Sequence, residues 1–202
     1  MSAAVLTPTG PMALRLRPGA AQGIALWVFM GVATALFSLF GVAYVMRLSA
    51  SDATAIGMPW QLWLSSAWLL AGSVALQQAA WRAQRGLAAQ APLLAGGACA
   101  LAFVATQGWA WQALLSAKVS FAGNPAGSFF FLLTALHALH VAGGLVAWAW
   151  VQRAPERLSG GAAWRIALCA RYWHFLLFVW VALFAMLRFI DPAIAAQICG
   201  TR

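Results

Sequence analysis

Long apolar runs alternate with short polar segments along almost the whole chain. Five such runs cover residues 23–46, 60–81, 93–115, 128–151 and 172–190. Each is close to the roughly 20 apolar residues that a helix needs to cross a bilayer. The last run is bounded by Arg171 and Arg188, whose long side chains can reach back to the membrane interface. The pattern therefore predicts an all-α, polytopic membrane protein with five transmembrane helices.

The polar segments carry residues that are typical of helix breaks. Pro59 precedes the second run, an Asn-Pro pair at 124–125 separates the third from the fourth, and a Gly-Gly pair at 160–161 lies in a predicted loop over 152–170. No connection is long enough for a soluble domain. The first run has full spanning length, which argues against a cleavable signal peptide. We expect an N-terminal tail over 1–22, a five-helix domain over 23–190 and a C-terminal tail over 191–202.

The composition agrees with a membrane protein. The 202 residues are 64% hydrophobic and 7% charged, whereas a soluble domain carries about 25% charged residues. The 12 Trp residues favour the membrane interface. The net charge of +9 is dispersed between the apolar runs and forms no basic stripe, so nucleic acid is not an expected partner. The three cysteines lie far apart, without metal-binding spacing.

The basic residues predict the orientation. Eight Lys and Arg residues fall on the N-terminal side of the predicted topology and four on the other side. The positive-inside rule then places the N-terminus in the cytoplasm and the C-terminus outside the membrane. The only acids are Asp52, Glu156 and Asp191, and all lie outside the apolar runs or at their ends. A transporter usually carries a carboxylate at membrane depth, so a self-sufficient carrier is disfavoured.

Three histidines lie within or at the start of the apolar runs. His137 and His140 are three residues apart and share one helix face, while His174 starts the last run. With that run beginning at 172, His140 and His174 differ in depth by roughly 12 Å, which is unfavourable for one haem between them. His137 and His140 alone would also lack ligands for a metal ion. We therefore expect the histidines to pack helices through hydrogen bonds, with no metal site and no catalytic residue.

Small and polar residues in the same runs predict close helix packing. The Gly96-Gly97 and Gly143-Gly144 pairs allow another backbone to approach closely, and Gln107 and Thr134 can hydrogen-bond between helices. Ser65, Ser66, Ser73 and Thr106 can do the same. Arg171 and Trp173, at the predicted inner interface, are candidate residues for a lipid headgroup.

Two sequence blocks then point to a known family. FFFLLTALHALHVAGG, over 129–144, resembles the FF-x-L-T-G-x-H-x-x-H-V-x-G-G pattern of cytochrome c oxidase subunit III, and RYWHFLLFVW, over 171–180, resembles its final Y-W-H-F-x-D-x-x-W motif. Looser similarity extends over about 23–190, which corresponds to the short, five-helix form of the subunit III of haem-copper oxidases. The paired histidines, double glycine and Tyr-Trp-His-Phe rarely occur together by chance.

The resemblance implies a non-redox accessory subunit in the inner membrane of a bacterial cell. Such a subunit binds no haem or copper, which reside in partner subunits. It contacts oxidase subunit I chiefly and also subunit II, holds phospholipid in a cleft, stabilises the catalytic subunit and supports proton uptake during oxygen reduction. The chain would then belong to an oxidoreductase complex of aerobic respiration without catalysing the reaction itself.

The chain departs from the family pattern at two places. Many members carry a buried glutamate in the first shared helix, where this chain has Ala33 and Thr34, and the usual Asp of the final motif is Leu177. A direct proton-collecting role through those carboxylates is therefore unexpected. Two alternatives remain open. One is an accessory subunit of a nitric oxide reductase or quinol oxidase, and the other is a small haem-binding membrane cytochrome that uses His140 and His174.

Overall fold

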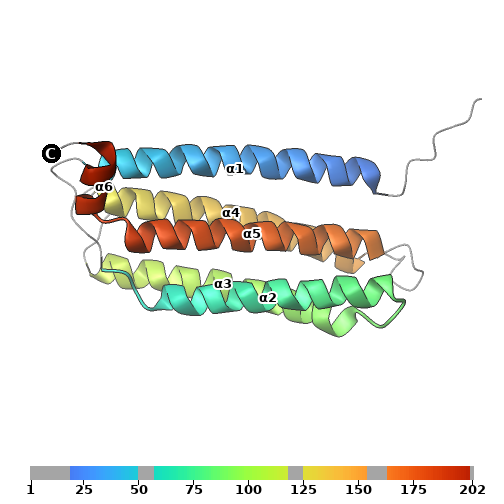
Figure 1. The fold of residues 1–202 in the computed structure, drawn as a ribbon. Coiled ribbons are helices and arrows are strands. Elements are labelled where there is room, and N and C mark those ends of the chain that lie inside the picture. Colours follow the sequence, from blue (N-terminus) through green and yellow to red (C-terminus); the bar gives the residue numbers. More distant parts are fainter. Residues whose placement is uncertain (1–18, 50–56, 118–124, 154–162, 201–202) are drawn as a thin grey trace, which may run out of the picture.

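The computed structural model describes residues 19–49, 57–117, 125–153 and 163–200, and this part of the chain forms helices without a strand. The six helices are α1 (Ala20–Leu48), α2 (Gln61–Gln84), α3 (Gln90–Ser116), α4 (Pro125–Arg153), α5 (Ala163–Phe189) and α6 (Pro192–Cys199) (Figure 1). The predicted all-α class is therefore confirmed. Most of the predicted N-terminal tail and the glycine pair of the 152–170 loop lie outside the described residues.

The five long helices lie side by side in a bundle, with α5 in its middle. α5 contacts α2 on one side and α1 and α4 on the other, while α2 and α3 form the most extensive helix pair. α1 lies at the opposite edge from α2 and α3 and contacts only α4, α5 and α6 among the larger helix contacts (Figure 1). Every long helix therefore reaches α5 directly or through one neighbour.

Four helices of the described chain are long and apolar enough to cross a membrane, namely α1, α3, α4 and α5. α2 has 24 residues but is less apolar, because Gln61, Gln77, Gln78 and several small residues dilute its hydrophobic side chains. These four helices support a membrane protein. The five-span count stays a prediction.

α5 is longer than its apolar run. It begins at Ala163, nine residues before the predicted start, so Arg165 and Arg171 lie on the helix instead of in the loop. The arginines were read as loop charges, but guanidinium groups can stack on aromatic rings at the membrane interface. Arg165 lies 4.5 Å from the centroid of the Trp150 ring and 5.2 Å from that of Trp164. This extension changes the depth at which every residue of α5 lies.

A sixth helix occupies part of the predicted C-terminal tail. The Asp191 side chain accepts a hydrogen bond from the backbone N–H of Ile194 at 2.8 Å, and Pro192 follows at the first helical position. Gly200 ends the helix with φ +67°, a left-handed conformation that favours glycine. α6 packs against α1.

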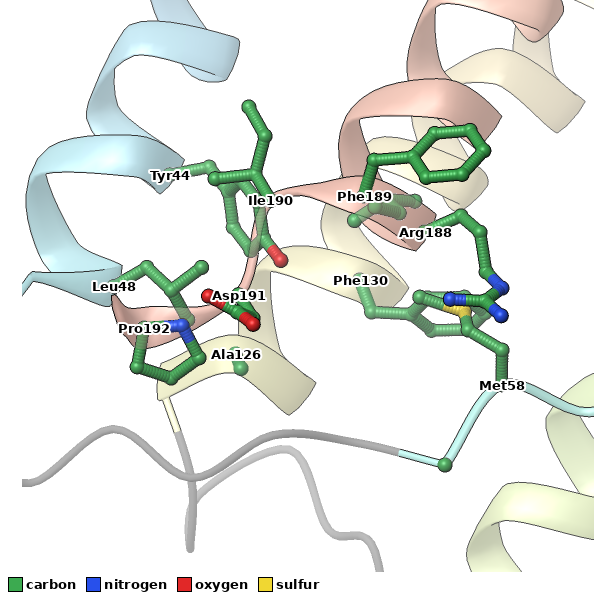
Figure 2. A pocket seen from close by; sticks show the side chains of 12 residues that line it. Tyr44, Leu48, Met58, Ala126, Phe130, Arg188, Phe189, Ile190, Asp191 and Pro192 are labelled. Carbon is green, nitrogen blue, oxygen red and sulfur yellow. The ribbon is translucent and has the colours of Figure 1, made fainter. Parts of the chain in front are cut away.

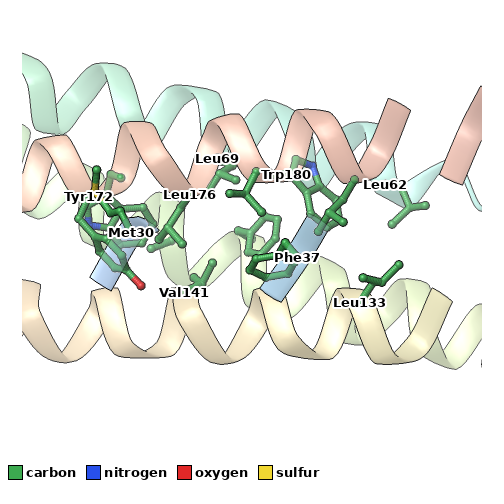
Figure 3. Packing of buried hydrophobic residues seen from close by; sticks show 14 of the residues in the cluster. Met30, Phe37, Leu62, Leu69, Leu133, Val141, Tyr172, Leu176 and Trp180 are labelled. Atoms are coloured by element: carbon green, nitrogen blue, oxygen red, sulfur yellow. The ribbon is translucent and has the colours of Figure 1, made fainter. Parts of the chain in front are cut away.

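Large buried side chains fill the centre of the bundle (Figure 3). Trp180 and Leu176 from α5 lie there with Leu69 from α2 and Val141 from α4, all with 1% exposure or less. α1 contributes Phe37, which is 8% exposed. Since lipid is as apolar as these side chains, van der Waals packing holds the helices together more than burial does.

Candidate functional site

His137 lies at the point where α1, α3, α4 and α5 meet. The ring, on α4, has no exposed surface and packs against Phe37, Phe103 and Trp180, with centroid separations of 6.4, 5.6 and 5.1 Å. Among the described residues, neither of its ring nitrogens has a hydrogen-bond partner. His137 thus contacts three other helices through its ring faces and edges.

His140, one turn further along α4, faces α1. Its Nδ1 lies 2.7 Å from the carbonyl oxygen of Leu136, and because a carbonyl only accepts, Nδ1 carries the hydrogen. The ring packs against Phe29 and Phe37 at 5.8 and 5.2 Å between centroids. The Tyr172 hydroxyl of α5 donates to the His140 carbonyl oxygen at 3.0 Å. His140 therefore joins α4 to both α1 and α5.

His174 on α5 faces α2. Its Nδ1 lies 2.5 Å from the Ser73 hydroxyl oxygen, and its Nε2 lies 2.8 Å from the Gln77 amide oxygen. An amide oxygen only accepts, so Nε2 carries the hydrogen and Nδ1 accepts from the Ser73 hydroxyl. We call Ser73, Gln77 and His174 the α2–α5 polar triad. Ser73 was expected as an interhelical donor from the sequence, whereas Gln77 was not.

The three histidines thus point in three directions, although two of them lie at similar depth. With α5 beginning at Ala163, His174 lies 11 residues from that end, and His140 lies 13 residues from the same end of α4 at Arg153. At 1.5 Å per residue the depths differ by roughly 3 Å, so the predicted separation of about 12 Å was wrong. The direction of the rings, towards α1 and α2 respectively, is what separates them. The described residues contain no group of three or more His, Cys, Asp or Glu side chains that could hold a metal ion.

Thr134 and Gln107, the other predicted polar packing residues, lie at the α3–α4 contact. Thr134 donates to the carbonyl oxygen of Phe130 at 2.7 Å and accepts from the Trp111 indole at 3.1 Å, which links α4 to α3. Gln107 is 2% exposed, and its amide has no partner among the described residues. It lies one turn along α3 from Phe103, which packs on His137.

Three of the four predicted packing glycines lie against neighbouring helices. A Cβ atom at Gly96 would lie 2.5 Å from Cγ of Leu76 on α2, and one at Gly97 would clash with the Trp148 ring on α4. One at Gly144 would lie 3.2 Å from the Tyr172 ring on α5. Gly143 has no atom within 4 Å of such a position. It lines a groove at the helix surface instead.

Arg171 and Trp173 are not brought together. Arg171 is exposed, and its guanidinium lies 5.9 Å from the centroid of the Trp27 ring on α1. Trp173, two residues on, faces the opposite way and is fully buried. Arg165 was not among the predicted headgroup residues, because the sequence pattern places it in a loop. Arg165 lies beside Trp150 and Trp164 at the same end of the bundle.

Two apolar grooves run between α1 and the rest of the bundle. The first, of about 330 Å³, lies between α1, α4 and α5 towards the Trp150 end, and Phe29, Gly143, Trp150 and Arg165 line it. The second, of about 520 Å³, lies between α1 and α5 nearer their other ends, with Thr34, Gly41, Phe178 and Met186 along its walls. Only part of α1 therefore touches the bundle.

A third pocket, of about 460 Å³, lies at the end of the bundle where α1 and α5 finish and α6 begins. Figure 2 shows Tyr44 and Leu48 from α1, Ala126 and Phe130 from α4, and Arg188 and Asp191 around it. Asp191 is the only acidic residue in the described part of the chain, and its side chain caps α6. The Asp191 carboxylate thus serves local structure.

Comparisons with known proteins agree with the sequence motifs. The chain is 36% identical over 92 residues to a probable cytochrome c oxidase subunit 3 of Mycobacterium tuberculosis, and the match covers 45% of each chain. Proteins of the same name from Nocardia farcinica and Mycobacterium leprae are 33% identical over 90 residues and 34% identical over 92 residues. The chain thus spans a little under half the length of the curated relatives it matches. No family model matches it. The resemblance to the subunit III family is confirmed over this part of the chain.

Proposed function

We propose that this chain is a non-redox accessory subunit of a haem-copper terminal oxidase, of the cytochrome c oxidase type. The similarity to three proteins named probable cytochrome c oxidase subunit 3 carries the proposal. The histidines support it, because each ring contacts neighbouring helices of the same bundle. The chain would stabilise the catalytic subunit without taking part in electron transfer. Haem and copper would reside in partner subunits, with oxidase subunit I as the main contact and subunit II as a further partner.

In this proposal α2 also crosses the membrane, which gives five spans. Its 24 residues extend about 36 Å, and it lies against α3 and α5 along the bundle. Among the described residues, five arginines lie at the end of the bundle where α2 ends and α5 begins, and two lie at the opposite end. This asymmetry favours a cytoplasmic position for the arginine-rich end, with the N-terminus, in a bacterial inner membrane.

The groove lined by Arg165 would hold a phospholipid. Its wall is almost entirely apolar, which suits an acyl chain, and the Arg165 guanidinium at its end suits a phosphate. Arg165→Gln should lower the amount of phospholipid that co-purifies with the complex. Arg85→Gln is the matched control, because Arg85 stacks on Trp81 at 3.5 Å, outside the groove. Equal loss of lipid in both variants would contradict this assignment.

Support for proton uptake would come through structure instead of through relayed protons. Positions 33 and 177 carry alanine and leucine, so neither offers a carboxylate. Ala33 is 2% exposed on the inner side of α1, and Leu177 is half-buried on α5. The chain would hold the shape of the catalytic subunit at its proton entry. Proton transfer itself would use the residues of that subunit.

Deletion of the chain tests the stabilising role. If it only stabilises, the assembled remainder of the oxidase should keep most of its initial rate of oxygen consumption but lose activity sooner during turnover. Immediate and complete loss of activity in an assembled remainder would contradict the proposal. Purification of the tagged chain in mild detergent, with identification of the haem types that accompany it, would separate a cytochrome c oxidase from a nitric oxide reductase or quinol oxidase.

A further inference from the structure

The α2–α5 polar triad is unusual because two of its three side chains lie on the outer surface of the bundle. Gln77 and His174 are both exposed, while Ser73 is buried. The hydrogen bond between His174 and Gln77 is exposed, whereas the other described hydrogen bonds between the membrane-spanning parts of different helices, such as Trp180 to Ser66 and Trp111 to Thr134, are at least partly buried. Exposed polar side chains inside a bilayer are costly, and such residues almost always face protein or a water-filled cavity. We therefore expect the exposed side chains of the triad to contact another polar group, which lipid hydrocarbon cannot supply.

The depth of the triad places it inside the apolar layer. Along α2, Gln77 lies five residues and Ser73 nine residues from Arg82, which is in the last turn of the helix. These spacings correspond to about 7 and 13 Å. Arg82 and Arg85 mark the interface at that end of the helix. The triad thus lies deeper than the headgroups, where water is scarce.

The hydrogen bonds within the triad fix what it presents outward. The Ser73 hydroxyl donates to His174 Nδ1, and His174 Nε2 donates to the Gln77 amide oxygen. Both histidine nitrogens and the amide oxygen are then engaged. The NH₂ group of Gln77 keeps two donors and has no recorded partner among the described residues. An acceptor oxygen would complete the set.

The surroundings of the triad form one continuous face. α5 lies between α2 and α1 (Figure 1). Phe178 on α5, one turn beyond His174, is exposed. Phe178 also lines the second groove, beside α1. We call the surface made by α1, α5 and α2 around His174 and Phe178 the triad face. It combines a fixed polar donor with an apolar groove, which suits a helix better than a lipid tail.

We infer that the triad face docks a transmembrane segment of another subunit, which presents an acceptor oxygen to the Gln77 amide within the bilayer. The inference rests on the proposed function, in which that subunit is the haem-bearing one. A single interhelical hydrogen bond of this kind contributes about 0.6 to 1.7 kcal/mol. Loss of the Gln77 donors should therefore weaken the association about 3- to 15-fold, since each 1.4 kcal/mol is tenfold.

Site-specific photocrosslinking tests which face is covered. p-Benzoylphenylalanine placed at Phe178 should crosslink to the haem-bearing subunit in native membranes. Leu139 on α4 is the matched control, because the two side chains are 69% and 66% exposed and lie at similar depth. The position at 139 should give lipid adducts. Crosslinks to the haem-bearing subunit from 139 but not from 178 would overturn the inference, as would only lipid adducts, or a second copy of this chain, at 178.

Two substitutions test the acceptor. Gln77→Leu should lower the fraction of haem-bearing subunit retained by the tagged chain after a detergent wash, by about 3- to 15-fold. Gln78→Leu, the same change on the next residue of α2, should have little effect, since Gln78 is outside the triad. Equal losses in the two variants would overturn the inference. If no haem protein co-purifies with the unmodified chain, the proposed function itself fails. If a haem protein does co-purify but crosslinks to position 139 and not to position 178, only the proposed docking surface is refuted.

Discussion

The α2–α3 pair and α1 show two ways of holding a helix in this bundle. α2 and α3 meet at small residues. A Cβ atom at Gly72 would lie 3.2 Å from that of Cys99, and one at Gly96 would lie 2.5 Å from Leu76. α1 contacts the bundle along a seam of Met30, Ala33, Phe37, Tyr44 and Leu48, and only 17% of its most apolar stretch is buried. In α5 that share is 50%.

How apolar a helix is and how tightly it packs against the bundle are therefore separate properties in this protein. α1 is the most apolar helix, yet grooves separate it from its neighbours over part of its length. α2 is too polar to qualify as a span by composition, yet it takes part in the most extensive helix contact. Because lipid replaces apolar contacts at little cost, close packing and hydrogen bonds decide which helices hold together. α1 accordingly packs less tightly against the rest of the bundle than the other long helices do.

The largest effect is expected from overpacking the α2–α3 contact. Gly96→Ala places a methyl group 2.5 Å from Cγ of Leu76, so one helix must shift. The free energy of unfolding in detergent should fall by about 2 to 3 kcal/mol. Gly31→Ala on α1 is the matched control, because no atom lies within 4 Å of its new methyl group. That change should be neutral or stabilise by about 0.5 kcal/mol. A similar fall in the free energy of unfolding in the two variants would contradict the claim that α2 and α3 pack more tightly than α1 does.

Removal of the main contact on the α1 seam should have the next largest effect. Phe37→Ala deletes a ring that packs against both His137 and His140. Within a bilayer the loss is mainly one of van der Waals contact, so we expect about 1 to 2 kcal/mol. The labelling rate of a cysteine introduced at a buried α1 position, such as Ala33, should rise in the same variant. Unchanged labelling would mean that α1 is held elsewhere.

A smaller effect is expected at the α4–α5 contact. Tyr172→Phe removes the hydrogen bond to the His140 carbonyl but keeps the ring. The free energy of unfolding should fall by about 0.5 to 1 kcal/mol. Phe175→Leu, at the partly buried neighbour that stacks on Tyr172, indicates how much ring packing alone contributes. A larger loss at Phe175 than at Tyr172 would show that packing, not the hydrogen bond, joins these helices.

The smallest effect is expected at the centre of the bundle. His137→Phe keeps the ring volume and removes two buried nitrogens that have no partner among the described residues. Stability should stay the same or rise by up to about 1 kcal/mol, because the polar atoms are buried without compensation. A loss above about 1.5 kcal/mol, measured by unfolding in detergent, would show that His137 hydrogen-bonds to a group beyond the described residues.

Much of the fold could be predicted from where the charges lie. Long charge-free runs gave the order and approximate position of all five long helices. The first turns of α5 could not be found this way, because Arg165 and Arg171 were counted as loop residues. The helix in fact begins at Ala163, and Arg165 lies beside the rings of Trp150 and Trp164. α6 had a readable signal in Asp191, Pro192 and Gly200, but its short apolar run was taken for a tail.

The candidate site was only partly predictable, since sequence gives the residue types but not their rotation about the helix. The sequence predicts that the histidines and Thr134 hydrogen-bond between helices. Among the described residues, His174 and Thr134 do so, whereas the His140 ring bonds within α4 and the His137 ring has no partner. The partners of His174 could not be read from the sequence, because Gln77 and Ser73 lie 97 and 101 residues away along the chain. Arg171 and Trp173 show the same limit: two residues apart on a helix, they face opposite sides.

The central claim is that the imidazoles of this chain pack helices and hold no haem of their own. An absorption spectrum of the purified chain, taken before and after its partner subunits are removed, tests it most directly. We expect a Soret band only while the partners are present, and no haem bound to the separated chain. A Soret band stoichiometric with the isolated chain, lost in a His140→Ala or His174→Ala variant, would contradict it.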